Sequence, residues 1–283
     1  MTPRRPPAPT GGTWPVRFGH AELVRDLDRP AGWMLLVDGT PQSYVDAGDP
    51  EHLEFDYVRL LADLVDASSE PAVPLRVVHL GGGGCTLARW VAARRPGSTQ
   101  VVVEADDLLA EVVRAQLGTT GFRLRVGDAR AALEHLQPGA SDVVVGDCFV
   151  GARVPGHLTT VEHVWQVAGV LKPGGTYVVN LADSGSLVFI RQQVATMQAV
   201  FAHVLLLGDP GVLRGRRFGN LVLAGSQRPF PLELLRRVTA RSLGRARVVA
   251  GADLTAFAAG ARPATDADPP TAPTPPPELF AAR

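Results

Sequence analysis

The chain has 283 residues, of which 46% are apolar and 20% are charged, an ordinary composition for a globular protein that buries a core. Its formal net charge is zero, so no overall field attracts nucleic acid or an anionic membrane. The sequence holds neither the roughly 20 consecutive apolar residues of a membrane-spanning helix nor the apolar stretch of a secretory signal, and we therefore expect a cytoplasmic location.

Proline-rich ends and a turn signal define the expected N-terminal region. The sequence predicts an unstructured N-terminus over residues 1–15 and an unstructured tail over residues 261–283, because such segments bury too little apolar surface to offset the entropy of ordering. Short apolar runs around Asp38-Gly39 predict a small antiparallel β-hairpin domain over residues 16–48. Its expected strands are Val16–Phe18, Glu22–Asp26, Gly32–Asp38 and Gln42–Asp46.

An alternation of strands and helices predicts a second domain over residues 49–260. Asp49-Pro50-Glu51 is typical of a helix start, and apolar residues follow at helical spacing. From residue 75 onward, short Val- and Leu-rich segments alternate with helical ones, which indicates a doubly wound, Rossmann-like α/β fold with a mainly parallel sheet, of the class I methyltransferase type. The expected strands are Arg76–Leu80, Gln100–Glu104, Arg123–Val126, Ser141–Gly146, Gly175–Asn180, Ala202–Leu207 and Asn220–Ala224. The expected helices are 86–95, 107–117, 129–136, 158–171 and 231–242.

The ends of the first three parallel strands predict a nucleoside pocket, because ligands of doubly wound sheets bind beyond the carboxyl ends of the strands. Gly81, Gly82 and Gly83 follow the first strand, where a ligand can approach the backbone closely, although a tight turn alone also explains them. Glu104 ends the second strand, where a carboxylate can accept both ribose hydroxyls or serve the structure only. Asp128 follows the third strand and can accept from an adenine amino group, cap the next helix, or do both.

The end of the fourth strand predicts the reacting part of the site. Asp147 lies there and can take a proton from an attacking amine, unless it only orders its loop. Cys148 and Phe149 follow it and are expected to contact the substrate. Because the first and fourth strands are neighbours in such a sheet, we expect Cys85 and Cys148 both to flank the crevice, with Cys85 the more reactive thiol at a helix N-terminus. Two inert apolar fillers are the alternative, and two cysteines are too few for a four-thiolate zinc site.

An acidic segment precedes the first expected helix. Its carboxylates can complement the helix dipole, with His52 as the only counter-charge nearby in the sequence. Asp46 lies too early for that role, so an acidic rim for a cationic substrate is the alternative. The acidic residues are Asp46, Asp49, Glu51, Glu54 and Asp56.

These residues resemble the spermidine synthase (polyamine aminopropyltransferase) family over about residues 20–225. The matching elements are Asp38-Gly39, Gln42, the acidic segment 46–56, Gly81–Gly84, Glu104, Gly127-Asp128, Asp147 and the Leu171–Gly175 turn. The resemblance implies a pocket for decarboxylated S-adenosylmethionine or S-adenosylmethionine, with the nucleoside held by Gln42, Glu104 and Asp128 and with Asp147 as the base. It also implies a small-molecule amine acceptor, often a homodimer, and no metal.

Two positions depart from the family pattern. The family's glycine turn usually reads Gly-Gly-Gly-Asp-Gly-Gly, and Gly84 stands here where that aspartate contacts the aminopropyl ammonium. Its catalytic loop usually reads Asp-Ser-Ser-Asp-Pro, and Val150 replaces the second aspartate, which holds the amine. Because a cationic amine needs carboxylates, the polyamine half of the site is eroded. The expected function is aminopropyl transfer, with methyl transfer from S-adenosylmethionine and non-catalytic nucleoside binding as alternatives.

Overall fold

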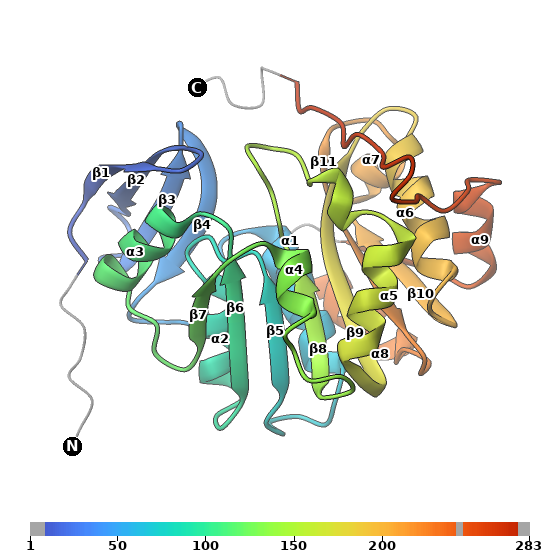
Figure 1. Ribbon diagram of the computed structural model, residues 1–283, viewed down its shortest axis with the longest axis horizontal. Coiled ribbons are helices and arrows are strands. Elements are labelled where there is room, and N and C mark those ends of the chain that lie inside the picture. The colour runs from blue at the N-terminus through green and yellow to red at the C-terminus, as the bar shows by residue number, and fades with distance from the viewer. Residues whose placement is uncertain (1–8, 242–245, 277–283) are drawn as a thin grey trace.

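Two β-sheets form the framework of the molecule, a small antiparallel one and a large one that carries most of the helices (Figure 1). The computed structural model describes residues 9–241 and 246–276. The small sheet has the order β1-β2-β3-β4, with strands Gly12–Val16, Gly19–Arg25, Gly32–Val37 and Thr40–Asp46. Asp38 and Gly39 join the last two strands with positive φ angles of 46° and 74°, which confirms the predicted hairpin turn.

The large sheet has the order β12-β10-β11-β9-β8-β5-β6-β7. Strands β9, β8, β5, β6 and β7 run parallel, and β11, β10 and β12 extend the sheet from β9 in antiparallel fashion. The predicted doubly wound fold is confirmed, including the neighbouring position of β5 and β8. The strands are β5 Arg76–Leu80, β6 Thr99–Glu104, β7 Arg123–Val126, β8 Ser141–Gly146, β9 Leu171–Asp183, β10 His203–Gly208, β11 Gly219–Ser226 and β12 Arg247–Ala250.

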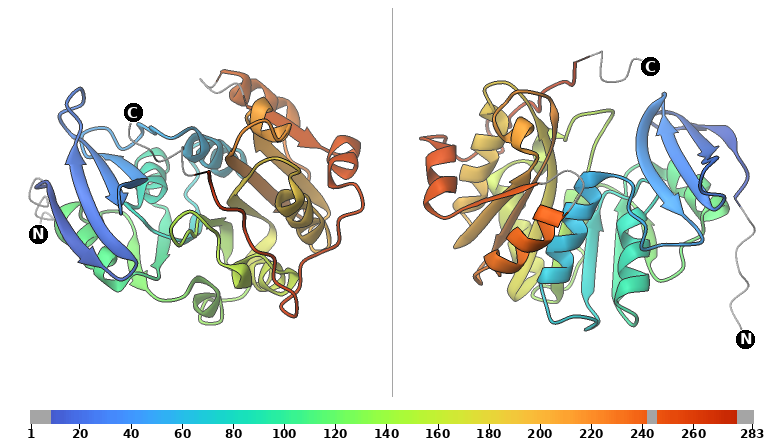
Figure 2. Two further views of the ribbon diagram at one scale, coloured as in Figure 1. Left: turned by 90° about the horizontal axis from the view of Figure 1, so that it is seen from above. Right: turned by 180° about the vertical axis from the view of Figure 1, so that it is seen from behind.

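Helices cover both faces of the large sheet (Figures 1 and 2). On one face α1, α2 and α8 bury apolar side chains such as Leu61, Val91 and Leu235, and on the other α4, α5 and α6 bury Leu133 and Ile190, among others. A third cluster joins the small sheet to α2 and α3. The helices are α1 Asp56–Ala67, α2 Thr86–Arg94, α3 Asp107–Gln116, α4 Ala129–Leu133, η1 Gly156–Leu158, α5 Val161–Val170, α6 Val188–Gln198, α7 Pro210–Leu213, α8 Leu232–Arg241 and α9 Ala252–Ala258. Among the described residues, none of these helices is long and apolar enough to cross a membrane.

The first helix starts later than the sequence predicts. Helix α1 begins at Asp56, whereas Asp49-Pro50-Glu51 forms a turn in which the His52 N–H donates to the Asp49 carbonyl at 3.0 Å. The Asp49 carboxylate is paired with the Arg29 guanidinium at 3.2 Å and caps no helix. Asp49 therefore does not start a helix as predicted, because the Arg29 guanidinium, from the connection between β2 and β3, binds its carboxylate instead.

The folded part of the chain is longer at both ends than expected. Residues 12–15, expected to be unstructured, belong to β1, which pairs with β2 along its length. The tail runs along α5 and α6 up to residue 276, with Ala264 bonded to the Val161 N–H and to Thr196 (Figure 1). Asp266 also forms an ion pair with Arg130 at 2.7 Å. The proline-rich composition did not predict an ordered tail, because the order comes from polar contacts to residues distant in the sequence. The rest of the expected unstructured ends, 1–8 and 277–283, lies outside the described residues, as does residue 242 of the last expected helix.

A buried arginine fixes the connection that leads from α1 to β5. The Arg95 side chain is fully buried and donates to the Asp66 carboxylate at 3.1 Å and to the carbonyls of Asp66, Glu70 and Val73 at 2.6–2.9 Å. This one guanidinium satisfies several backbone acceptors that no helix or strand pairs. It therefore holds the C-terminal end of α1, the helix that carries Tyr57, against the sheet.

We expect Arg95→Met to destabilise the protein by about 3–5 kcal/mol, because it leaves several carbonyls without their donor and removes the buried one of the two guanidinium partners of Asp66. Urea unfolding measures the change. The matched control is Arg94→Met, since the neighbouring Arg94 side chain is 48% exposed and pairs with the same Asp66 at 3.5 Å. That control should cost no more than about 1 kcal/mol. Equal losses in the two variants would contradict the role given to Arg95.

Candidate active site

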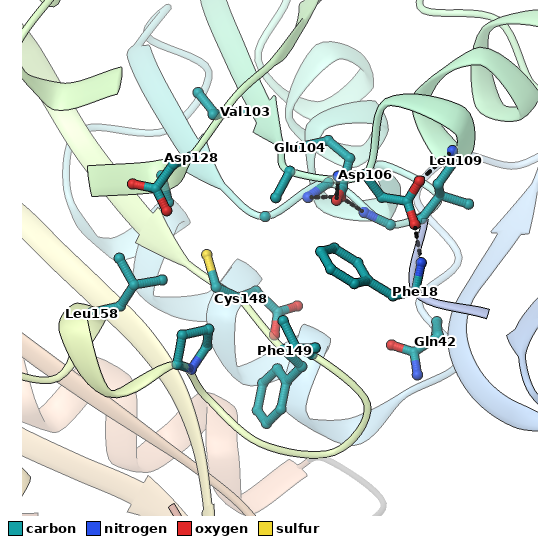
Figure 3. A pocket seen from close by; sticks show the side chains of 18 of the residues that line it. Phe18, Gln42, Val103, Glu104, Asp106, Leu109, Asp128, Cys148, Phe149 and Leu158 are labelled. Carbon is teal, nitrogen blue, oxygen red and sulfur yellow. Dashed lines mark hydrogen bonds between the residues drawn. The ribbon is translucent and has the colours of Figure 1, made fainter. Parts of the chain in front are cut away.

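A cavity of about 330 Å³ lies beyond the carboxyl ends of β5, β6, β7 and β8. The small sheet and the β1–β2 turn form its opposite wall, through Gln42 and Phe18 among others (Figure 3). Its volume lies in the range of small-molecule sites, about 300–1,000 Å³. Every expected site residue except Asp46 lines it, namely Gln42, Gly81, Gly82, Gly83, Glu104, Asp128, Asp147, Cys148 and Phe149.

The glycine turn lies against the end of β8 more closely than any side chain allows. Gly81 has a φ of +93°, and a Cβ there would lie 2.1 Å from the carbonyl oxygen of Asp147. Gly83 has a φ of +46° and faces the cavity. Gly84 is buried behind the turn, where a Cβ would lie 2.9 Å from the Ser43 Cβ. Gly84 does not line the cavity, whereas Gly83 does, so the effect of the missing aspartate at position 84 stays a prediction.

Glu104 ends β6 and holds the glycine turn through backbone hydrogen bonds. Its Oε2 accepts the N–H groups of Gly82 and Gly83 at 2.9 and 3.0 Å, and its Oε1 accepts the Asp106 N–H at 3.0 Å (Figure 3). Since a carboxylate oxygen has two lone pairs, Oε2 is filled and Oε1 keeps one. Glu104 thus has room for one ribose hydroxyl in this conformation, and its role as a ribose ligand stays a prediction.

Asp106 ties the small sheet to the large one beside this carboxylate. Its Oδ1 caps α3 through the Leu109 N–H at 2.9 Å and also accepts the Arg17 N–H, while its Oδ2 accepts the Phe18 N–H at 3.1 Å (Figure 3). Asp106 is not among the residues that the sequence pattern predicts for the site. Its position before an apolar helix gives a capping signal, but the contact with the β1–β2 turn has no sequence signal.

Asp128 follows β7 and caps the next helix, which is one of the two roles that the sequence predicts for it. Its Oδ1 caps α4 through the N–H groups of Arg130 and Ala131, both at 2.9 Å, and its Oδ2 lies 2.9 Å from His157 Nε2. Burial favours the neutral acid, but the Ala131 N–H and His157 outweigh it and lower the pKa of Asp128. Asp128 lines the cavity and its Oδ2 has a second lone pair, so adenine recognition stays a prediction.

Asp147 has side-chain partners that the sequence analysis did not identify. Asn180 on β9 donates its Nδ2–H to Asp147 Oδ1 at 2.9 Å, and the Tyr57 hydroxyl on α1 also bonds to the carboxyl. Burial raises the pKa of Asp147 to about 6, and the hydrogen bonds from Asn180 and Tyr57 counter it only in part. Burial, with Asp147 nearby, also raises the pKa of Tyr57 well above its ordinary value. Such a carboxyl exchanges a proton near neutral pH, as a general base requires.

Asp46 does not belong to the cavity, and the acidic rim expected around it is wrong. Its buried carboxylate pairs with Arg29 at 2.8 Å and accepts the N–H groups of Gly48 and Asp49. Arg29 also pairs with Asp49, and Arg59 pairs with Asp56 at 2.9 Å. His52 is therefore not the only counter-charge. The β2–β3 connection brings Arg29 beside Asp46, which their separation in the sequence conceals.

Only one of the two cysteines lines the cavity. Cys148 does, whereas the Cys85 side chain is buried in the cluster between α2 and the small sheet. Burial raises the pKa of the Cys85 thiol to about 12, so the expected reactive thiol at this position is wrong. Burial also raises the pKa of Cys148 well above its ordinary value. In residues 9–241 and 246–276, no three His, Cys, Asp or Glu side chains are grouped to hold a metal ion.

Comparison with known proteins gives curated relatives of one kind. The sequence matches no protein-family model. It is 27% identical over 148 residues to the polyamine aminopropyltransferase of Chromobacterium violaceum, covering 51% of this chain and 56% of that protein. It is also 27% identical over 163 residues to the polyamine aminopropyltransferase of Vibrio vulnificus, covering 55% and 52% respectively. The chain therefore spans about half the length of the curated relatives it matches.

Solved structures of the same fold extend the comparison over most of the chain. A probable spermidine synthase from Corynebacterium glutamicum is 35% identical, with a TM-score of 0.85 over 92% of this chain and 97% of that chain. A spermidine synthase in complex with the transition-state analogue AdoDATO is 17% identical, with a TM-score of 0.61 over 82% and 78%. Human methyltransferase-like protein 13 in complex with SAH is 20% identical, with a TM-score of 0.52 over 66% and 93%. The last two comparisons show the fold alone.

We expect Asp147→Asn to be more stable than the wild type at pH 8. The pKa of Asp147 is about 6 in the folded state and 3.8 ordinarily, so between these values only the folded state binds the proton. The free energy of unfolding of the wild type therefore falls as the pH rises from 3.8 to about 6, and the full loss is reached above about pH 6. Asparagine removes the charge and keeps an acceptor for Asn180. The gain should be about 2–3 kcal/mol at pH 8 and vanish below about pH 4.

Urea unfolding of both proteins across this pH range measures the effect. Asp56→Asn is the control, because Asp56 is an exposed carboxylate paired with Arg59 at the start of α1. It should be neutral or slightly destabilising at pH 8. If Asp147→Asn shows no gain at pH 8, the carboxyl does not carry a raised pKa.

Proposed function

The chain belongs to the spermidine synthase (polyamine aminopropyltransferase) family, and from this premise we propose that it transfers an aminopropyl group from decarboxylated S-adenosylmethionine to an amine. The observation that carries the proposal is the position of Asp147, whose pKa burial raises to about 6, on the wall of the cavity that Glu104 and Asp128 also line. A base of this pKa beside a nucleoside-sized cavity suits the removal of a proton from an attacking amine.

Three residues form the proposed nucleoside side of the cavity. Oε1 of Glu104, which accepts the Asp106 N–H, has a lone pair left for a ribose hydroxyl. Oδ2 of Asp128 has one left beside His157 for the adenine amino group. Gln42 reaches toward the cavity from the small sheet (Figure 3). These groups suit a nucleoside because they offer acceptors at separate places along one cavity.

Asp147 is the proposed base. The sulfonium cosubstrate supplies a carbon that is already activated, so the chain has mainly to position the amine and accept its proton. The amine nitrogen bonds to the propyl carbon next to sulfur, the carbon–sulfur bond breaks with its electron pair going to sulfur, and methylthioadenosine leaves. The Asp147 carboxylate takes the proton that the new ammonium releases, while Asn180 and Tyr57 keep the carboxylate in place.

The remaining parts of the proposal follow from the resemblance to the family and, for the location, from the composition of the sequence. The acceptor is a small-molecule amine, the location is cytoplasmic, and two copies of the chain form a homodimer. Neither nucleic acid nor a membrane nor a metal ion takes part in the proposed reaction, which needs only an amine, a sulfonium and a base.

Methyl transfer from S-adenosylmethionine is a second candidate, favoured by the glycine turn. Gly82 and Gly83 line the cavity there, and neither offers a carboxylate to the ammonium of a decarboxylated cosubstrate. A cosubstrate that retains its carboxylate meets no repulsion from these two positions. The remaining carboxyls of the cavity, Glu104, Asp128 and Asp147, favour the decarboxylated form because its net positive charge is larger.

We expect Glu104→Gln to weaken methylthioadenosine binding by about ten- to a hundredfold, since a hydrogen bond to a charged acceptor contributes about 1.5–3 kcal/mol. Glutamine retains one oxygen for the N–H groups of Gly82 and Gly83, so the turn should persist. Titration calorimetry gives Kd, and urea unfolding separates lost binding from lost folding. The control is Glu111→Gln on the exposed side of α3. A folded Glu104→Gln protein with wild-type Kd would rule out the ribose role.

The two candidate reactions predict different cosubstrate preferences. For aminopropyl transfer we expect decarboxylated S-adenosylmethionine to bind at least about tenfold more tightly than S-adenosylmethionine, a difference of about 1.4 kcal/mol. Titration calorimetry of each compound, with methylthioadenosine as the reference, measures this. The opposite preference would select methyl transfer. Failure of all three to bind would exclude both reactions.

A further inference from the structure

A second cavity of about 210 Å³ adjoins the first on the side of Phe149. The two share Gln42, Tyr57, Phe149 and Gly151 among their lining residues, so these residues border both cavities. Figure 3 shows Phe149 and Gln42 on the side of the first cavity away from Val103 and Asp128. Strands β9 and β11 complete the second cavity. Asp147 lines the first cavity, and Asn180, which donates to it, lines the second, so the second cavity reaches the proposed base from the side of Asn180, where an acceptor can approach.

The wall of this second cavity is uncharged. Its lining side chains are aromatic, aliphatic or neutral polar, represented by Tyr57, Phe149, Phe218, Ala182 and Asn220. In the described part of the chain, none of its lining residues carries a carboxylate. An ammonium group bound against this wall would lose part of its water without gaining an anionic partner, which is unfavourable.

Nearby carboxylates are engaged elsewhere. Asp183 follows the lining residue Ala182, but its carboxylate accepts the N–H groups of Ser184 and Ile190. Asp56 precedes the lining residue Tyr57, but its carboxylate pairs with Arg59 at 2.9 Å. Neither side chain lines the cavity. Neither of these two side chains therefore offers a carboxylate to the far end of a diamine bound in the cavity.

The flanking charges are positive. Arg153 follows the lining residue Ala152, and Arg216 and Arg217 precede the lining residue Phe218; all three are exposed. Aromatic faces attract a cation, but less strongly than a paired carboxylate does. Arg217 is paired with Asp209 at 3.1 Å. The guanidinium groups of Arg153 and Arg216 are therefore the ones that reduce that attraction further.

Asn180 provides the polar group at the junction of the two cavities. It is 2% exposed and lines the second cavity. Its Nδ2–H donates to Asp147 Oδ1, whereas its own Oδ1 has no hydrogen-bond partner among the described residues. A buried acceptor without a donor is destabilising, so this oxygen marks a place for an N–H group of a ligand.

We propose that this second cavity binds the acceptor and selects a primary monoamine with an uncharged apolar or aromatic body, rather than a diamine or polyamine. The inference rests on the proposed aminopropyl transfer. The attacking nitrogen donates one N–H to Asn180 Oδ1, and after the new carbon–nitrogen bond forms it releases one proton to Asp147. The apolar body lies against Phe149 and Phe218, and no second ammonium is buried.

Pentylamine and putrescine form a matched pair of probes, because they have the same number of heavy atoms and differ by a methyl group in place of one ammonium. With protein saturated by methylthioadenosine, titration calorimetry is expected to give a Kd for pentylamine at least about tenfold lower than for putrescine. Equal or tighter binding of putrescine would overturn the inference, and so would failure of both amines to bind.

Adding a carboxylate to the second cavity tests the same explanation in the opposite direction. Ala152 lines the second cavity on a partly exposed loop, so Ala152→Asp adds an anion there without burying it fully. Putrescine binding should tighten by at least about tenfold relative to Ala152→Asn, which adds the same bulk without charge. Equal putrescine affinity in the two variants would show that the missing carboxylate does not set the preference.

Turnover separates this inference from the function on which it rests. Release of methylthioadenosine from decarboxylated S-adenosylmethionine is measured with each amine. Release with pentylamine above that with putrescine supports both ideas, and the reverse order overturns the acceptor class while the transferase reaction stands. Release with neither amine contradicts the proposed reaction, and the binding order of the two amines still decides the acceptor class.

Discussion

The backbone contact between Gly81 and Asp147 is the constraint on which the cavity depends. Asp147 donates its N–H to the Leu80 carbonyl, and Gly81 donates its N–H to the Val103 carbonyl, so the ends of β5, β6 and β8 are joined. A Cβ on Gly81 would lie 2.1 Å from the Asp147 carbonyl oxygen, and only glycine permits this approach. The arrangement brings the carboxyl groups at the ends of β6 and β8 to one cavity.

The carboxylates of the site differ in their hydrogen-bond partners. Glu104, Asp106 and Asp128 each accept two or more backbone N–H groups, which orders the loops around the cavity before any ligand binds. Asp147 has side-chain partners, Asn180 and Tyr57, and burial keeps its pKa near 6. The first group can therefore serve as fixed acceptors, whereas Asp147 can exchange a proton in the pH range where an enzyme works.

The fold is that of the family, and the proposed acceptor side of the site is uncharged. The large sheet and the carboxyls at the strand ends are those expected of the family, and the fold aligns with a probable spermidine synthase over 97% of that chain. The second cavity, by contrast, is lined by loops and strand ends without a carboxylate in the described chain. Side chains on loops can change without altering the sheet, because they contribute little to the core.

The sequence by itself determined the parallel sheet, the hairpin turn and the cavity residues at the strand ends. It did so because hydrophobic periodicity is local, and because parallel strands bring their carboxyl ends to one edge. Only the tertiary structure decided that Arg29 neutralises Asp46, that Cys85 turns into the core, and that Asn180 and Tyr57 meet at Asp147. These contacts join residues from separate elements, and no periodicity or spacing encodes which side chains meet once the sheets are in place.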